Sequence, residues 1–245
     1  MPKRIQVLFF CTITGLFFPA LIAQTGSGNS GDVDIQNCMA CHIEKFQEWK
    51  TSKHASVENG VLCTACHKSH DGFTPTELVM EPKQLCDSCH VHRAVLEGKG
   101  AKGIEETRSM HSAIACTGCH MSDGNHRVKV IMPDDPDLSE NRVDSCTACH
   151  KDDSREIRAA QIKDYRAWYN ESMDPLKMEL EAFENTLKEN PGLLNVELQA
   201  KLDDIKSNLA IIMEDGSDGI HNLDYALEIM ALAKRDLKKI KAAIE

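Results

Sequence analysis

Cysteine and histidine recur along the chain in one fixed pattern that is suited to redox chemistry. Five times, two cysteines stand three positions apart and a histidine follows the second, giving C-x-x-C-H. This spacing is the attachment signature of c-type haem, because two thiols can bind one porphyrin edge and the next imidazole can ligate the iron. We therefore expect five covalently bound haem c groups. The cysteines are Cys38, Cys41, Cys63, Cys66, Cys86, Cys89, Cys116, Cys119, Cys146 and Cys149, and the proximal histidines are His42, His67, His90, His120 and His150.

Zinc ribbons and disulfide scaffolds also use paired cysteines, but neither explains the histidine that follows every pair. Zinc ribbons combine C-x-x-C units two at a time, and this chain has five. A disulfide scaffold suits an exported chain but does not require the histidine. The eleventh cysteine, Cys11, lies in an N-terminal apolar stretch, so every cysteine after it belongs to a motif. Haem attachment is the favoured interpretation.

Six histidines outside the motifs are candidates for the second axial position of the irons. Five irons with two imidazoles each need five of them. His92 stands two residues from His90 and is predicted to be the spare. His70 follows His67 by three residues, so on a helical turn both would point the same way, and His70 would serve a neighbouring haem. The predicted distal ligands are His54, His70, His111, His126 and His221, with methionine ligation by Met80, Met110, Met121 or Met132 as the alternative. The sequence does not assign distal histidines to haems.

The motifs are crowded into residues 38–150, which leaves about 23 residues for each haem, too few for an ordinary side-chain core. The porphyrins are expected to replace that core and to lie close enough to exchange electrons. After His150 the composition changes. Residues 151–245 contain no cysteine and one histidine, and apolar residues recur there at helical spacing.

These patterns predict a mainly α fold with much irregular loop. A haem-packed multihaem cytochrome c domain (residues 38–150) would be followed by long antiparallel α-helices (residues 151–245). Asn190-Pro191-Gly192 marks the first turn between helices, and Pro175 predicts a restart or kink in the first helix. The second loop, around Gly216 and Gly219, would deliver His221 back to a haem. A self-contained hairpin or dimerisation element is the simpler interpretation of these helices.

The N-terminus has the features of an export signal. Lys3 and Arg4 precede an apolar stretch, and Ala23 offers a cleavage point, so residues 1–23 are predicted to be a signal peptide. A membrane anchor is the alternative. Residues 24–37 are predicted to be a flexible linker, and no further apolar stretch is long enough to span a membrane. The formal net charge of −10 argues against binding to a nucleic-acid backbone. The protein is expected in the periplasm or at the cell surface.

Three segments resemble the multihaem family of ammonia-forming cytochrome c nitrite reductase, octahaem nitrite reductases and hydroxylamine oxidoreductase. They are Cys119-His120-Met121 with His126 and the motif ending at His150, the long helices after the last haem, and Gly219-Ile220-His221-Asn222. In that family the last segment opens the final helix and supplies a distal histidine. The stretch from Cys41 through Trp49 to His54 is similar to hydroxylamine oxidoreductase relatives and tetrahaem cytochromes. The resemblance covers most of residues 38–230.

Two departures from that family argue against catalysis. The C-x-x-C-K motif that typically binds the active haem does not occur, and the chain is much shorter than those enzymes. We therefore expect a non-enzymatic pentahaem carrier of anaerobic respiration. Its expected partners are a quinol dehydrogenase, a terminal reductase or other cytochromes with a basic docking surface, and a homo-oligomer through the C-terminal helices. The alternative is a small reductase or oxidase of nitrogen or sulfur oxyanions with one open iron. In that case Arg108, Arg127 and Lys129 are available to bind the anion.

Overall fold

The computed structural model describes residues 30–69, 78–136, 138–139 and 141–244. Within these ranges the chain is mainly α-helical, and the β-structure is one isolated bridge between His67 and Leu78. The predicted fold class is confirmed. The predicted signal peptide (residues 1–23) and the predicted ligand His70 lie outside the described residues. No helix in the described part of the chain is long and apolar enough to cross a membrane.

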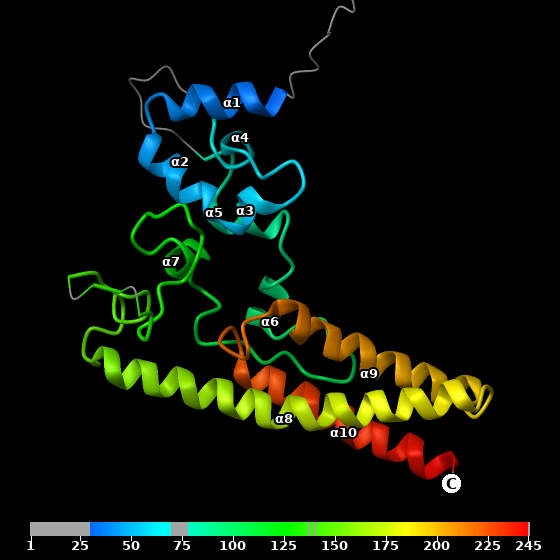
Figure 1. Ribbon diagram of the computed structural model, residues 1–245. Coiled ribbons are helices and arrows are strands. Elements are labelled where there is room, and N and C mark those ends of the chain that lie inside the picture. Colours follow the sequence, from blue (N-terminus) through cyan, green and yellow to red (C-terminus); the bar gives the residue numbers. More distant parts are fainter. Residues whose placement is uncertain (1–29, 70–77, 137, 140, 245) are drawn as a thin grey trace, which may run out of the picture.

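The cysteine-rich part is built from short helices joined by long irregular segments, and it lies against one side of three long helices (Figure 1). Each motif occupies a short helix or a tight turn, because Gly, Ser and Thr around the motifs favour turns over long helices. The short helices are α1 (Ser30–Met39), α2 (Ile43–Lys50), α3 (Lys53–Ser56), α4 (Cys63–Cys66), α5 (Pro82–Asp87), α6 (Arg93–Glu97) and α7 (Thr117–His120).

Helix α1 forms where the sequence analysis expects a linker up to residue 37. Glycine and serine are concentrated in residues 26–31 and do not occur in Asp32–Met39, so the second half of the segment can remain helical. The helix packs beside α2 and α4. The chain is therefore ordered several residues before the first motif begins at Cys38.

The long helices begin and end at capping residues. The Ser154 hydroxyl accepts a hydrogen bond from the Ile157 amide, and the Asn195 side chain accepts one from the Leu198 amide. Gly216 ends the second helix in the left-handed conformation, with φ of 64°. The three helices are α8 (Arg155–Glu189), α9 (Val196–Asp215) and α10 (Leu223–Ile244).

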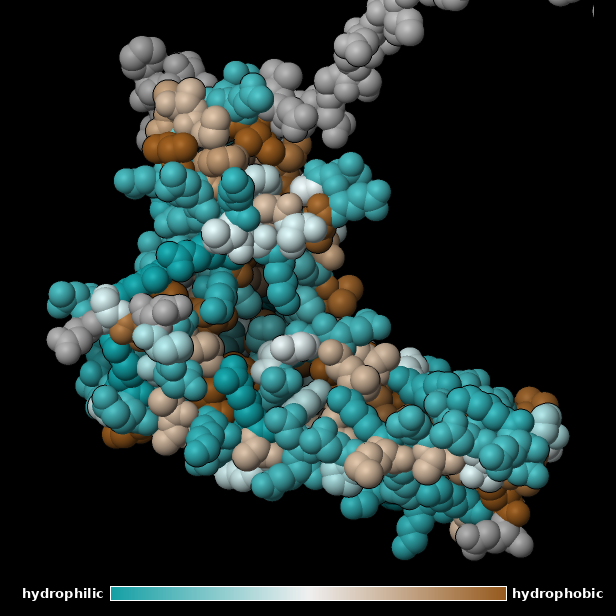
Figure 2. Space-filling view, viewed as in Figure 1, coloured by the Kyte–Doolittle hydropathy of each residue, from teal (hydrophilic) through white to brown (hydrophobic). Residues whose placement is uncertain are grey.

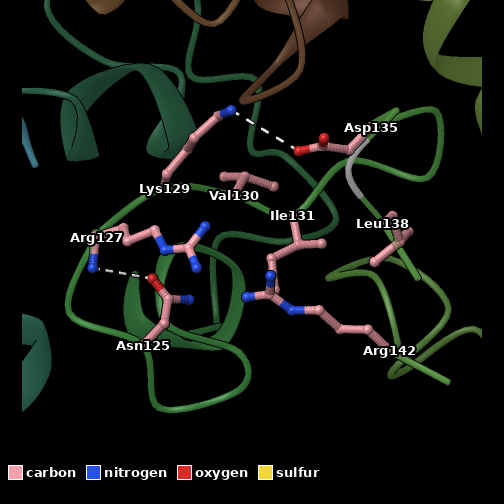
Figure 3. A pocket seen from close by; sticks show the side chains of 8 residues that line it. All are labelled: Asn125, Arg127, Lys129, Val130, Ile131, Asp135, Leu138 and Arg142. Atoms are coloured by element: carbon pink, nitrogen blue, oxygen red, sulfur yellow. Dashed lines mark hydrogen bonds and ion pairs between the residues drawn. The ribbon is translucent and has the colours of Figure 1, made fainter. Parts of the chain in front are cut away.

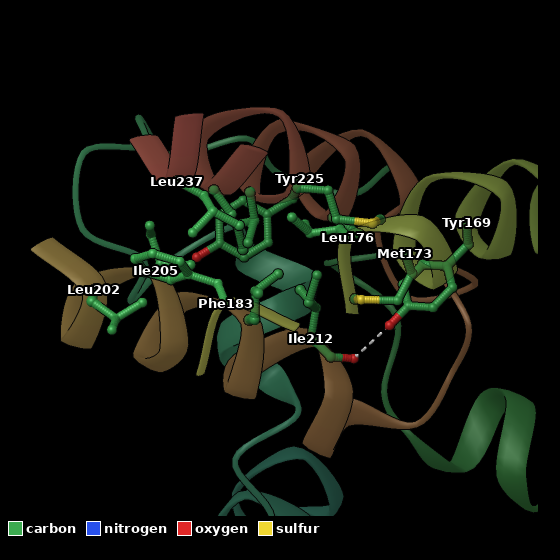
Figure 4. Close-up of a cluster of buried hydrophobic side chains, with 14 of the residues drawn as sticks. Tyr169, Met173, Leu176, Phe183, Leu202, Ile205, Ile212, Tyr225 and Leu237 are labelled. Carbon is green, nitrogen blue, oxygen red and sulfur yellow. Dashed lines mark hydrogen bonds between the residues drawn. The ribbon is translucent and has the colours of Figure 1, made fainter. Parts of the chain in front are cut away.

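One continuous cluster of buried apolar side chains holds these helices together (Figure 4). The Tyr169 hydroxyl donates to the Ile212 carbonyl at 3.2 Å, which links α8 to α9. Helix α10 packs on both α8 and α9. The most deeply buried members are Met173, Leu176, Leu202, Leu209, Ile212, Tyr225, Ala226, Ile229, Ala233, Leu237 and Ile240.

Helix α8 does not restart at Pro175 but continues from Arg155 to Glu189. Proline lacks the amide donor that this position would use, which weakens the helix locally. Met173 and Leu176, on either side of it, are 0% and 2% exposed in the shared core. Packing on both sides of Pro175 therefore holds the helix together where local propensity would interrupt it.

The segment that follows α6 is the seam between the two parts of the molecule. The Ala101 amide donates to the Tyr225 hydroxyl at 2.9 Å. The Asn208 side chain accepts from the Lys102 amide at 2.8 Å and donates to the Lys102 carbonyl at 2.9 Å. These hydrogen bonds satisfy backbone groups of an irregular segment with buried side chains of α9 and α10. The seam fixes the cysteine-rich part relative to the long helices.

The cysteine-rich part has few apolar side chains in its interior. Among the described residues before α8, Val95 and Ile131 are the buried hydrophobic residues, and Val95 belongs to the core of the long helices. Figure 2 shows hydrophobic residues at the surface around α1, whereas the visible face of the long helices is largely hydrophilic. Something other than side chains must complete the interior of this part.

Candidate haem sites

The five motifs share one local conformation. In each, the histidine amide donates a hydrogen bond to the carbonyl of the first cysteine, four residues earlier, over 2.9–3.0 Å. This is one turn of α-helix, which brings positions 1, 4 and 5 of the motif to the same side. Both thiols and the imidazole can therefore approach one porphyrin together. The ten cysteines are all free, so their thiols are available for attachment.

Consecutive motifs lie close enough for their thiols to interact. Burial and the neighbouring Cys89 thiol raise the pKa of Cys66, and burial and the Cys149 and Cys116 thiols raise that of Cys119. A hydrogen bond with the Cys86 thiol lowers the pKa of Cys116 to about 6. Electrostatic interactions between thiols therefore link the second motif to the third, the third to the fourth and the fourth to the fifth.

Four motif histidines each face an imidazole from outside the motifs. A metal–imidazole bond is about 2 Å long, so two imidazoles on opposite sides of one metal have ring centroids about 6 Å apart. The centroid separations are 5.9 Å for His54 and His90, 6.0 Å for His67 and His126, 6.0 Å for His111 and His150, and 6.2 Å for His120 and His221. The spacing of the pairs fits an iron between the rings.

The candidate imidazoles are also partly shielded from solvent. The Nδ1 atoms of His67, His92 and His126 are buried and have no hydrogen-bond partner in the described structure. Burial is the main cause that lowers the pKa of six imidazoles, which favours the neutral form that binds metals. The six are His54, His67, His92, His111, His120 and His126. The residues present therefore fit c-type haem.

His54 is held by α3 and by the turn that follows it. The Ser52 hydroxyl caps α3 by accepting from the Ala55 amide at 3.3 Å, and Ser52 is 5% exposed. The Val61 amide donates to the His54 carbonyl at 2.8 Å, and the Trp49 indole donates to the Val61 carbonyl at 2.9 Å. Trp49 thus fastens the turn that returns the chain past His54, which orients its ring toward His90.

His126 is positioned by α2, although it follows α7 in the chain. Its amide donates to Glu48 Oε2 at 3.0 Å, and Lys45 bridges Glu48 and the Gly124 carbonyl, each at 3.1 Å. The hydrogen bond from the His126 amide and the nearby Lys45 ammonium outweigh burial and lower the pKa of Glu48. The polar side chains of one element thus place a histidine that lies 78 residues further along the chain.

His221 reaches the haem region from the loop between α9 and α10. Its amide donates to the Ser217 hydroxyl at 3.1 Å, and its Nδ1 lies 2.6 Å from Asp215 Oδ1. Gly219 has φ of 86°, and a Cβ there would lie 2.9 Å from the Leu223 side chain, so the tight turn requires glycine. The loop brings the His221 ring beside that of His120, a motif histidine. This placement is consistent with the expectation that the loop returns His221 to a haem.

His92, predicted to be the spare histidine, lies among the candidate ligands. Its ring centroid is 5.3 Å from that of His90 and 6.1 Å from that of His221. Its Nδ1 is 3.5 Å from Asp215 Oδ1. His92 therefore stands between the ligand pair of the third motif and that of the fourth.

Two charged residues that contact the candidate histidines are absent from the predicted site residues. Asp215 contacts His221, and Arg158 Nη2 lies 2.6 Å from Nδ1 of His150. Asp215 ends helix α9, far from the motifs in sequence, and Arg158 lies in α8, eight residues after His150. Neither belongs to the C-x-x-C-H pattern.

A small cleft beside the fourth motif gathers three cations (Figure 3). Lys129 lies 3.8 Å from Asp135, and Arg142 forms an ion pair with Asp123 at 2.6 Å. Arg127 and Lys129, two of the three cations proposed for an oxyanion, line this cleft, whereas Arg108 does not. Met110, a candidate alternative ligand, is 94% exposed.

The comparisons with known proteins agree with this geometry. Residues 54–94, which contain the second and third motifs, match the family model of the doubled CXXCH motif. The crystal structure of the outer cell wall cytochrome OcwA matches with a TM-score of 0.61 and 23% identity, over 82% of this chain and 45% of that one. The undecahaem cytochrome from the S-layer of Carboxydothermus ferrireducens matches with a TM-score of 0.50 and 20% identity, over 85% and 36%.

Residues 54–94 thus carry the doubled motif for covalent attachment of c-type haem, and the chain shares its fold with parts of two solved cytochromes. It spans less than half the length of either solved structure. No curated protein sequence matches it. The relation to nitrite and hydroxylamine enzymes that the sequence suggests stays a prediction.

Proposed function

We propose that this chain transfers electrons outside the cytoplasm through five closely spaced haems whose irons are held between two imidazoles each. The observation that supports it most is the set of four imidazole pairs with centroids 5.9–6.2 Å apart. When bound, haem supplies reversible one-electron chemistry at iron. The chain's contribution is to hold both axial positions and to keep the motifs adjacent.

With haem bound at the motifs, this pairing would leave no free axial position at four of them. His90 is paired with His54, His67 with His126, His150 with His111, and His120 with His221. An oxyanion or peroxide would have to displace an imidazole before it reached a metal. Such displacement is opposed by the contacts that hold the rings, such as the hydrogen bond from the His126 amide to Glu48. These sites suit electron transfer better than substrate binding. The partner of His42 would be His70.

The order of contacts between motifs supports a single path for electrons. Thiols of the second to the fifth motifs interact in sequence, and His92 fills the space between the third and fourth ligand pairs. Neighbouring haems in such an arrangement would exchange electrons without a mobile carrier. The expected entry and exit partners are a quinol dehydrogenase, a terminal reductase or other cytochromes.

The similar structures support a location beyond the cytoplasmic membrane. One of these proteins is an outer cell wall cytochrome, and the other comes from an S-layer. The predicted signal peptide in residues 1–23 agrees with export to the periplasm or the cell surface. The net charge of −10, made more negative by haem propionates, would steer the protein toward a basic partner surface.

An oxyanion reductase is the second candidate, and the cationic cleft of Arg127, Lys129 and Arg142 is the observation that favours it. It requires an iron with an open axial position. The structure pairs four of the five motif histidines, so such an iron would belong to the first motif.

Electron paramagnetic resonance of the oxidised, haem-loaded chain tests the two candidates. A carrier would show low-spin iron alone, unchanged by nitrite. A His126→Ala variant provides the positive control, because removing one imidazole would open one iron and produce a high-spin signal. A high-spin signal in the unmodified protein that shifts with nitrite would overturn the carrier proposal in favour of the reductase.

A further inference from the structure

Asp215, the last residue of α9, is a buried carboxylate. It contacts the imidazole of His221, which is paired with His120, and lies near that of His92. Its side chain is 3% exposed. Oδ1 lies 2.6 Å from Nδ1 of His221 and 3.5 Å from Nδ1 of His92. An ionised carboxylate can only accept hydrogen bonds, so Nδ1–H of His221 donates a hydrogen bond to Asp215. This leaves Nε2 of His221 free to face His120.

The loop fixes the carboxylate in this position. The Ser217 hydroxyl donates to Asp215 Oδ2 and accepts from the His221 amide. Gly216, between them, is left-handed with φ of 64°. At the end of the loop, Asn222 is 5% exposed and donates to the Val95 carbonyl at 3.0 Å. Asp215 and His221 are thus held together by a closed set of hydrogen bonds.

We propose that Asp215 positions His221 and lowers the reduction potential of the haem that His221 shares with His120. The inference rests on the proposed function, in which His221 is a distal ligand. The hydrogen bond selects the tautomer and orientation in which Nε2 faces the iron. The negative charge makes the imidazole a stronger donor and favours the oxidised iron, which carries one more positive charge. Because Asp215 is buried, salt and water screen this charge weakly.

Glu48, which lies beside the candidate distal ligand His126, is less buried than Asp215 and farther from the ring nitrogen. Glu48 Oε2 is 3.9 Å from Nδ1 of His126, and its side chain is 27% exposed. It accepts hydrogen bonds from the backbone amide of His126 and from the Lys45 ammonium. The charge of Glu48 is therefore farther from the ring and better solvated. We expect Asp215 to influence its haem more strongly than Glu48 does.

The test is a spectropotentiometric titration of the haem-loaded full chain. Asp215→Asn keeps the shape and an acceptor oxygen but removes the charge. It should raise the potential of one haem by at least about 59 mV, a tenfold change in a one-electron equilibrium, while all irons stay low-spin. Asp215→Glu should stay near the original potential. Glu48→Gln should shift another haem by less.

Asp218→Asn is the matched control, because it removes the same charge from the same loop, and Asp218 has no ion pair with a histidine in the described structure. It should leave every potential close to its original value. If Asp215→Asn loses haem or becomes high-spin, Asp215→Glu must restore both the low-spin iron and the original potential for the proposal to stand. The proposal is overturned if no potential moves in Asp215→Asn, or if Asp218→Asn shifts one equally.

A His221→Ala variant separates failure of this inference from failure of the proposed function. One high-spin iron in His221→Ala, together with unchanged potentials in Asp215→Asn, would reject the role of Asp215 and retain His221 as a ligand. Five low-spin irons in His221→Ala would reject His221 as a ligand, and the role of Asp215 with it.

Discussion

The two parts of the chain differ in how many apolar side chains they bury. The long helices α8 to α10 bury a continuous cluster of apolar side chains from all three elements. In the described residues before α8, the large buried hydrophobic side chains are Val95 and Ile131, and several buried residues there are polar, such as Asp144. One part is completed by its own side chains, and the other is shaped around a prosthetic group. The comparison indicates that haem attachment and folding are coupled in the first part alone.

The largest effect that would test this comparison comes from omitting haem. Full-length chain made without haem attachment should lose hydrogen-exchange protection in residues 38–69, 78–92, 108–136 and 141–150, because no other interior is available there. Residues 155–244 should keep protection, since their apolar core is unaffected. Hydrogen-exchange mass spectrometry of the two forms measures this. Equal protection in the cysteine-rich part with and without haem would contradict the claim that haem completes the interior of this part.

Truncating the apolar core of the long helices should act on the other part. Leu237 is 0% exposed, and Leu237→Ala should lower the free energy of unfolding by about 2–5 kcal/mol through lost burial and a cavity. Far-ultraviolet circular dichroism in denaturant reports the helices, and Soret absorbance reports the haems. The native Soret spectrum should not change. A changed haem spectrum before unfolding begins would mean that the two interiors are not separate.

Asn222 offers a way to weaken the link between the parts. Its side-chain amide donates to the Val95 carbonyl at 3.0 Å and to the Thr107 carbonyl at 2.5 Å. Asn222→Ala would leave both carbonyls without this donor at a cost of about 1–3 kcal/mol. The helical and haem transitions in denaturant should then separate along the denaturant axis. Transitions that remain coincident would show that other contacts carry the coupling.

The smallest expected effect comes from an ion pair on the surface of the long helices. Lys206 Nζ lies 2.7 Å from Glu184 Oε1, and the two side chains are 51% and 32% exposed. Lys206→Met should change the free energy of unfolding by less than about 1 kcal/mol, because solvent screens the pair. The same denaturation experiment checks it. A loss comparable to that of Leu237→Ala would contradict the view that burial holds this part together.

Local patterns predict the elements of the molecule better than they predict the partners within the sites. The C-x-x-C-H spacing and the apolar periodicity after His150 depend on neighbours along the chain, and the predicted long helices are present, with α8 running from Arg155 to Glu189. The pairing of His54 with His90 depends on how segments return to one another, which the sequence does not encode locally. The contact between Asp215 and His221 likewise depends on the fold of the loop after α9, which no local pattern predicts.

His92 shows the limit of reasoning from short separations. Because it stands two residues after His90, the sequence suggested that its ring points elsewhere. His92 is the N-cap residue of α6, without a side-chain cap hydrogen bond, and its ring centroid lies 5.3 Å from that of His90. Its role as the spare histidine stays a prediction.

Anomalous diffraction at the iron edge from crystals of the haem-loaded chain tests the central claim most directly. The claim is that haem irons occupy the spaces between the paired imidazoles of the cysteine-rich part. We expect five iron peaks for each chain, four of them midway between the rings of His54 and His90, His67 and His126, His111 and His150, and His120 and His221. An imidazole pair without an iron peak, or an iron at these motifs that faces a single imidazole, would contradict it.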